Sequence, residues 1–194
     1  MTDRKAFWMI GAGGLLILAG AACWWFGADG TLHRLLLASG PAAPRIVFLS
    51  ALGGFAVMGP VALAALALLL WRRRTADAVW LLLTIAIGRL AVEAVKLVVT
   101  RPRPPSGDWL EIVKSWSFPS SHSAGTMMTC VALAVLFGRG ERAMILALLA
   151  ALAIGWSRIA LGVHWPSDVL VGWGFGLAWL GLSLGFKGVV APSS

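Results

Sequence analysis

Six apolar segments divide the chain, with polar and charged residues gathered in the connections between them. The segments cover residues 7–26, 46–71, 76–99, 123–137, 143–161 and 168–186. A helix needs about 20 apolar residues to cross a bilayer, and all but the short fourth segment approach or exceed this length. The pattern therefore predicts an all-α chain with six transmembrane helices.

The composition supports a membrane protein. Apolar residues make up 59% of the chain and charged residues 12%, and the mean hydropathy is +0.87. A soluble domain of 194 residues could not bury that much apolar surface. No internal repeat divides the sequence, so we expect a single six-span domain over residues 1–194.

The basic residues predict the orientation. The formal net charge is +8, which could favour nucleic acid, but many of the cations lie in short clusters between apolar segments, as topology signals do. The clusters are Arg4 with Lys5, Arg72 to Arg74, Arg139 with Arg142, and Lys187. If six spans alternate, they share one side, so the positive-inside rule places both termini in the cytoplasm. We predict no nucleic-acid partner.

Three loops then face outward, at residues 27–45, 100–122 and 162–167. The first contains a short Leu-rich stretch, which we expect to form an amphipathic helix at the membrane surface, with His33 interfacial rather than catalytic. The second combines Arg101, Arg103 and Lys114 with tryptophans and aliphatic residues. Cations beside apolar anchors suit a phosphate headgroup whose tails remain in the bilayer.

Three separate pieces of sequence with polar chemistry fall at outward span ends, as a single site requires. Charged residues near membrane spans are costly and usually mark chemistry or a substrate path. The pieces are Lys96 with Arg103-Pro104, then Pro119-Ser120-Ser121-His122, and finally Ser157-Arg158 with His164 and Asp168.

The cations and the start of the fourth segment are suited to hold phosphate. Lys96, Arg103 and Arg158 supply positive charge where the dielectric is low, and an arginine can bind two phosphate oxygens at once. Ser120 and Ser121 precede or begin a helix, whose free backbone N–H groups and dipole favour an anion.

Two histidines and an aspartate can carry out phosphoryl transfer. His164 and Asp168 are four residues apart and share a face if they enter a helix. Asp168 can then orient one ring nitrogen of His164 while the other attacks phosphorus. His122 can protonate the leaving oxygen and later deprotonate water. Each signal is weak alone, but two of only three histidines meet the right cations on one side.

Taken together, these motifs resemble the three-part signature of the type 2 phosphatidic acid phosphatase superfamily. The first and third parts match fully, whereas the second has Ser121 in place of the usual glycine, which bears on the local turn rather than on the chemistry. The motifs span residues 96–168, and the six-span layout extends the resemblance to the whole chain. Soluble haloperoxidases share the motif, but the hydropathy here excludes their architecture.

The resemblance implies a membrane lipid phosphate phosphatase. It makes His164 the nucleophile, Asp168 its orienter and His122 the acid and base. It also implies phosphate binding by Lys96, Arg103, Ser120, Ser121 and Arg158. No metal or other cofactor is expected, in agreement with the absence of a carboxylate cluster in the sequence.

The expected substrates are undecaprenyl diphosphate, phosphatidylglycerophosphate or phosphatidic acid, hydrolysed at the periplasmic face of a bacterial cytoplasmic membrane. Two alternatives stay open at this point. A phosphotransferase would pass the phosphoryl group from the same residues to a lipid or sugar hydroxyl. A lipid-binding or translocating protein would use the cations without turnover, although it would need no oriented nucleophile.

Overall fold

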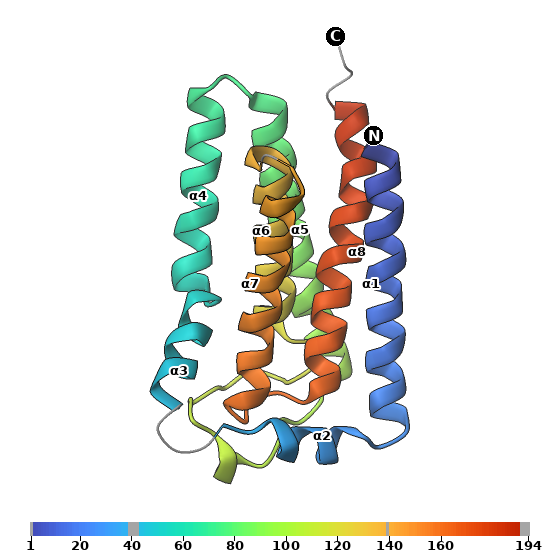
Figure 1. Cartoon of the computed structure of the whole chain (residues 1–194), viewed down its shortest axis with the longest axis vertical. Helices are drawn as coiled ribbons and strands as arrows, with labels where there is room; N and C mark the ends of the chain where they lie inside the picture. Colours follow the sequence, from blue (N-terminus) through green and yellow to red (C-terminus); the bar gives the residue numbers. More distant parts are fainter. Residues whose placement is uncertain (1, 39–42, 139, 191–194) are drawn as a thin grey trace.

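The computed structural model describes residues 2–38, 43–138 and 140–190. Its long helices run side by side as a bundle (Figure 1). In chain order they are α1 (Thr2–Trp25), α2 (Asp29–Leu36), α3 (Ala43–Leu52), α4 (Phe55–Trp71), α5 (Thr75–Val99), the 3₁₀ turn η2 (Ser106–Asp108), α6 (Ser121–Phe137), α7 (Glu141–Ala160) and α8 (Pro166–Val190). The described residues contain no strand, so the predicted all-α class is confirmed for them.

Five stretches of helix in the described residues are long and apolar enough to cross a membrane. They are Arg4–Trp25, Ala43–Trp71, Thr75–Val99, Glu141–Ala160 and Pro166–Lys187. Large apolar side chains on these helices point outward, and Leu15, Leu90 and Leu146 are each at least 66% exposed. In water that surface would be costly, whereas a lipid bilayer solvates it.

Two predicted segments differ from the helices observed. The segment at 46–71 is broken at Gly53 and Gly54, which separate α3 from α4. The fourth segment forms α6, a helix of 17 residues that packs against α5, α7 and α8. Most of α6 is buried inside the bundle, including Ser123, Thr126 and Thr129. A helix surrounded by protein does not need to match the thickness of the bilayer.

Helices α1 and α8 pack closely because small residues line their contact. A Cβ atom added to Gly13 of α1 would lie 2.6 Å from backbone atoms of Gly174 and Ala178 on α8. One added to Gly181 would lie 2.8 Å from the Ala6 carbonyl oxygen. Small residues allow helix backbones to approach in this way, so α1 follows α8 along its length (Figure 1).

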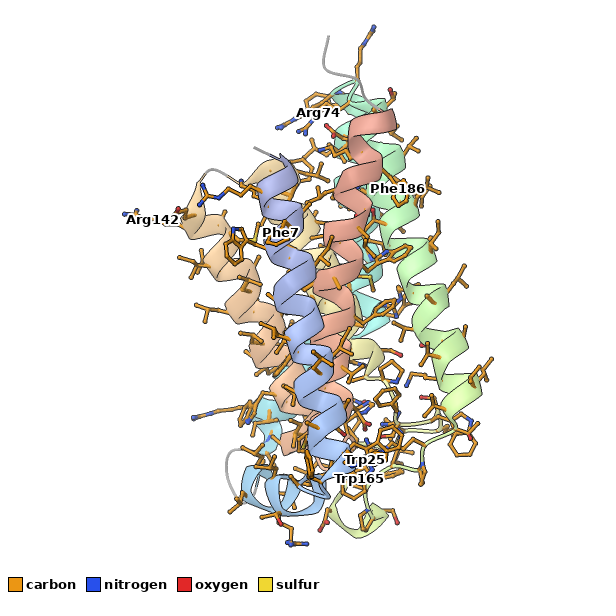
Figure 2. The ribbon with its side chains drawn as sticks, turned by 90° about the vertical axis from the view of Figure 1, so that its right-hand side faces the viewer. Phe7, Trp25, Arg74, Arg142, Trp165 and Phe186 are labelled. Carbon is orange, nitrogen blue, oxygen red and sulfur yellow. The ribbon has the colours of Figure 1, made fainter. Side chains whose placement is uncertain are left out.

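The two ends of the bundle differ in chemistry. Arg74 and Arg142 lie near one end, where α4 connects to α5, and Trp25 and Trp165 lie at the other (Figure 2). Arg139, from the same predicted basic cluster as Arg142, is outside the described residues. Helix α2 runs across the Trp-bearing end, close to the long loop between α5 and α6 (Figure 1). The predicted basic clusters and the predicted site are therefore at opposite ends.

Candidate active site

The predicted site residues come together at the Trp-bearing end of the bundle. The end of α7 is joined to the turn that carries His164, because the Arg158 carbonyl oxygen accepts from the backbone N–H of His164 at 3.2 Å. The Ser120 N–H donates to the Asp168 carbonyl oxygen at 3.0 Å. This bond sets the start of α6 beside the start of α8.

His164 lies in the tight turn between α7 and α8. Gly162 adopts a φ of +76°, a conformation that suits glycine, and a Cβ atom there would lie 2.3 Å from the Asp108 carbonyl oxygen. Helix α8 then begins at Pro166, so Asp168 falls in its first turn. The turn brings His164 Nδ1 to 3.4 Å from Asp168 Oδ2, which confirms the predicted juxtaposition of the two side chains.

The same carboxylate oxygen is held by two further donors. The Trp165 backbone N–H donates to Asp168 Oδ2 at 2.9 Å, and the Ser117 hydroxyl donates to it as well. Ser117 Oγ also lies 3.4 Å from His164 Nδ1. His164 is 2% exposed and Asp168 fully buried. Nδ1 thus faces the carboxylate, and the other ring nitrogen, Nε2, is left for other partners.

Arg103 occupies the side of His164 opposite to Asp168. Its Nη1 lies 3.1 Å from His164 Nε2 and donates to the Val163 carbonyl oxygen at 2.6 Å. Its Nε donates to the Ser115 carbonyl oxygen at 2.7 Å. Burial, followed by the nearby charge of Arg158, lowers the pKa of Arg103 to about 10. The guanidinium is therefore fixed beside Nε2, the ring nitrogen that faces away from Asp168. A bound anion at this position would stabilise the charged form of Arg103.

Lys96 and Arg158 complete the group of three predicted cations. Lys96 is buried, and its Nζ donates to the Trp116 carbonyl oxygen at 2.7 Å. Arg158 is 1% exposed, and its Nη1 donates to Glu111 at 2.6 Å and to the Ser50 hydroxyl. Its Nε is buried with no hydrogen-bond partner among the described residues. A buried donor of that kind is costly unless a ligand accepts from it.

The start of α6 uses its serine side chains for structure. Ser120 is the N-cap, and its Oγ accepts from the Ser123 N–H at 3.4 Å and the Ser123 hydroxyl at 3.0 Å. The Ser121 hydroxyl donates to Glu93 at 2.6 Å. The predicted contribution of these two serines to phosphate binding therefore rests on backbone N–H groups of the first turn.

Ser121 fits where the family pattern has glycine. It is the first residue of α6, whereas the non-glycine residues with positive φ in the described chain are Arg73 and Thr100. The freedom of glycine is thus not needed there. The next residue, His122, is half-buried beside Gly54, where an added Cβ atom would lie 3.7 Å from His122 Nε2.

The surroundings of His164 favour its neutral form. Burial contributes most to lowering its pKa well below the ordinary 6.5, followed by the charges of Arg103, Arg158, Lys96 and His122. An imidazole that stays neutral at physiological pH keeps a lone pair on one ring nitrogen. Nε2, beside Arg103, is the nitrogen that can act as a nucleophile.

Sequence reasoning placed Arg101 among the headgroup cations, and this is wrong. Arg101 is instead buried between Asp29 and Asp168, with which it forms ion pairs of 2.7 and 2.6 Å. His33, expected at the interface, is 2% exposed, and its ring lies 5.4 Å from that of Trp165. Asp29 was missed altogether, although an acidic residue beside an apolar span is itself a signal.

Other residues that the sequence motifs do not include contact the predicted site residues. Glu111 and Ser50 contact Arg158, Ser117 contacts Asp168, and Glu93 contacts Ser121. None of them belongs to the sequence motifs. As for metals, the described residues contain no group of three or more histidine, cysteine or acidic side chains that could hold an ion.

Curated proteins of known name are similar in sequence to this chain. The chain is 31% identical to an undecaprenyl-diphosphatase of Sulfolobus acidocaldarius over 140 residues, covering 70% of this chain and 65% of that protein. It is 35% identical to phosphatidylglycerophosphatase B of Bacillus subtilis over 124 residues, covering 59% and 60% respectively. The chain thus spans less than two thirds of the length of these curated relatives.

A solved structure shares the fold over nearly the whole chain. The crystal structure of a transmembrane PAP2-type phosphatidylglycerolphosphate phosphatase from Bacillus subtilis superposes with a TM-score of 0.83 at 25% identity, covering 96% of this chain and 98% of that one. The family model of the PAP2 superfamily matches residues 77–188, which is more than half of the sequence and includes every predicted site residue. The chain therefore belongs to the PAP2 superfamily.

Proposed function

We propose that this protein hydrolyses the terminal phosphate of a lipid phosphate or diphosphate through a phosphohistidine intermediate on His164. One observation carries the proposal: His164 Nδ1 faces Asp168 while Arg103 lies 3.1 Å from Nε2. The nucleophilic nitrogen and a phosphate-binding cation are therefore neighbours, and the other nitrogen is held by a carboxylate.

The first half of the reaction forms the intermediate. The Nε2 lone pair of His164 attacks phosphorus, the bond from phosphorus to the leaving oxygen breaks, and His122 donates a proton to that oxygen. Lys96, Arg103 and Arg158 bind the phosphoryl oxygens, and first-turn N–H groups of α6 face the same charge. The ring of His164 gains positive charge in this step, which Asp168 stabilises.

The second half regenerates the enzyme. His122, now neutral, takes a proton from water as the water oxygen attacks phosphorus, and the bond from phosphorus to Nε2 breaks. Inorganic phosphate leaves, and His122 holds a proton for the next leaving group. No step requires a metal or other cofactor.

The substrates named for its relatives, together with an apolar cavity, support a lipid substrate. The cavity measures about 250 Å³, lies between α4 and α5, and is lined by Phe55, Leu63, Leu82 and other apolar side chains. Arg89 borders it and also contributes to a small depression beside Ser121, at the start of α6. A hydrocarbon chain in this cavity would leave its phosphate end near the cations.

We infer six membrane spans for this chain, counting α6 with the five longer stretches. The basic clusters at the end of the bundle away from the site support cytoplasmic termini and a site on the periplasmic side of a bacterial cytoplasmic membrane. Helix α2 would then lie along the periplasmic membrane surface.

The test is phosphate release in EDTA from undecaprenyl diphosphate, phosphatidylglycerophosphate and phosphatidic acid in mixed micelles. The wild-type protein should release phosphate from at least one of them and be inhibited by vanadate, and His164→Ala should release none. Activity that requires a divalent metal, or an active His164→Ala variant, would refute the mechanism. A phosphorylated acceptor with little free phosphate would identify a phosphotransferase instead.

A further inference from the structure

A buried chain of three charges lies behind the nucleophile. The Arg101 guanidinium sits between two carboxylates, with Nη1 2.6 Å from Asp168 Oδ1 and Nη2 2.7 Å from Asp29 Oδ2. The three side chains are at most 9% exposed. The Trp24 ring, 4.2 Å from the guanidinium carbon, covers it on one side. Charges buried so deeply are costly unless each is paired.

Asp29 also binds the start of the helix that carries Asp168. Its Oδ1 accepts from the Ser167 N–H at 2.9 Å, and its Oδ2 accepts from the Ser167 hydroxyl. Ser167 is the second residue of α8. A carboxylate at a helix N-terminus satisfies free N–H groups and interacts favourably with the helix dipole. Here it comes from α2, so the first outward loop fixes the first turn of α8.

The two oxygens of Asp168 have separate partners. Oδ1 accepts from Arg101, whereas Oδ2 faces His164 and accepts from Ser117 and the Trp165 N–H. The side chains of Arg101 and Asp29 are therefore linked to His164 through Asp168. Asp29 also offsets the positive charge of Arg101. Without Asp29, that charge would be balanced by Asp168 alone, which is the carboxylate that faces His164.

We infer that Asp29 and Arg101 are positioning residues for the reaction, which hold Asp168 toward His164 and keep its negative charge available to the phosphohistidine. This inference rests on the proposed function. Its physical basis is that His164 gains positive charge as the intermediate forms, in a buried site where nearby charges act strongly.

Replacing Asp29 by asparagine tests the charge. Asp29→Asn keeps the size of the side chain but leaves the cation of Arg101 balanced by Asp168 alone. Formation of the cationic intermediate should slow, and kcat should fall about 10- to 100-fold, the range found when outer partners of a metal-bound histidine are removed. KM should stay constant or decrease, since the variant makes the site more positive toward phosphate.

The pH profile separates this role from a purely structural one. His164 is faced by Arg103, Arg158, Lys96, His122 and Asp168. Losing the negative charge of Asp29 makes the surroundings of His164 more positive, which lowers the pKa of His164 further. The acid limb of the kcat/KM profile, where His164 becomes protonated, should therefore move to lower pH. A variant that merely loosened α2 would leave the limb where it is.

Replacing Arg101 by lysine tests the geometry and serves if Asp29→Asn is poorly folded. Arg101→Lys retains the charge, but a single ammonium cannot reproduce a fork that contacts Asp29, Ser167 and Asp168. The kcat of Arg101→Lys should therefore fall, whereas the acid limb of its kcat/KM profile should stay where it is in the wild type because the charge is kept. The matched control is Asp77→Asn, which removes an acid paired with Arg74 and Lys187 away from the site, and it should keep wild-type kcat.

Purified wild-type and variant proteins are compared by phosphate release from whichever lipid the wild type hydrolyses, with thermal unfolding in detergent recorded for each. A wild-type kcat or a wild-type acid limb in folded Asp29→Asn, or a wild-type kcat in Arg101→Lys, would overturn the inference. A fall in kcat of the same size in Asp77→Asn would do so as well. An inactive wild type, by contrast, would refute the proposed function itself.

Discussion

The role of Arg103 provides the sharpest quantitative prediction. Its guanidinium is held beside His164 Nε2 by the Ser115 and Val163 carbonyl oxygens. It can present two donors to a phosphoryl group when the phosphoryl oxygens replace His164 Nε2 on Nη1 and one of the two Nη2 partners, the Ser115 hydroxyl at 3.1 Å and the Trp116 carbonyl oxygen at 3.2 Å. Hydrogen bonds to charged groups contribute about 1.5–3 kcal/mol each. Losing one of two such bonds in Arg103→Lys should therefore reduce kcat/KM about 10- to 150-fold, and losing both in Arg103→Gln about 100-fold or more.

The two substitutions should also differ in their pH dependence. Arg103 is the charged group that contributes most to the low pKa of His164, after burial. Removing its positive charge in Arg103→Gln raises the pKa of His164, so the acid limb of kcat/KM should move to higher pH. Arg103→Lys keeps a cation, and its limb should move less. This shift is opposite in sign to the one expected for Asp29→Asn.

The assay measures phosphate release between pH 4 and 9 with a substrate whose own ionisation is known. Arg142 is an exposed arginine at the other end of the bundle (Figure 2). Its variant Arg142→Gln is the matched control and should keep the wild-type kcat/KM and pH profile. If Arg103→Gln retained wild-type kcat/KM, or if its acid limb moved to lower pH, the assignment of Arg103 beside the nucleophile would be wrong.

Three further predictions concern acid catalysis, orientation and packing. His122→Ala should lose about 10²- to 10⁴-fold in kcat on lipid substrates, but much less on an aryl phosphate whose leaving group departs as an anion; equal losses would argue against a proton donor. Asp168→Asn should lower kcat by up to about 10⁴-fold, as does the loss of a carboxylate that orients a catalytic histidine, while phosphate binding, measured by product inhibition, changes far less; a large loss of phosphate binding would instead make it a binding residue. Gly13→Ala should destabilise the protein by about 1–3 kcal/mol, because its Cβ would lie 2.6 Å from the Ala178 nitrogen. Gly14→Ala, with open space around it, should not, as thermal unfolding in detergent can show.

The sequence was most informative where chemistry depends on short spacings. His164 and Asp168 are four residues apart in the sequence, and the structure places His164 Nδ1 3.4 Å from Asp168 Oδ2. Lys96, Arg103 and Arg158 could be recognised because cations at span ends are costly and thus conspicuous. Hydropathy likewise located the long helices, since the bilayer requires an apolar run of known length.

Features that depend on packing between distant segments could not be predicted in this way. Asp29, on α2, meets Arg101 and Ser167 from distant parts of the chain. The chain leads into α2 from α1, which lies against α8 through close contacts at glycines that an apolar pattern does not encode. Arg101 was misassigned for the same reason, since its partners come from two other parts of the chain. The break at Gly53 and Gly54 was also missed, because both residues sit inside a continuous apolar run.

Chemical trapping of the intermediate tests the central claim most directly. Wild-type protein mixed with a ³²P-labelled lipid phosphate and quenched in alkali within milliseconds should carry label that is stable in base and released by acid, as phosphohistidine is. Peptide mapping should place this label on His164, and His164→Ala should carry none. Turnover without a labelled histidine, or label on His122 instead, would contradict the mechanism proposed for this site.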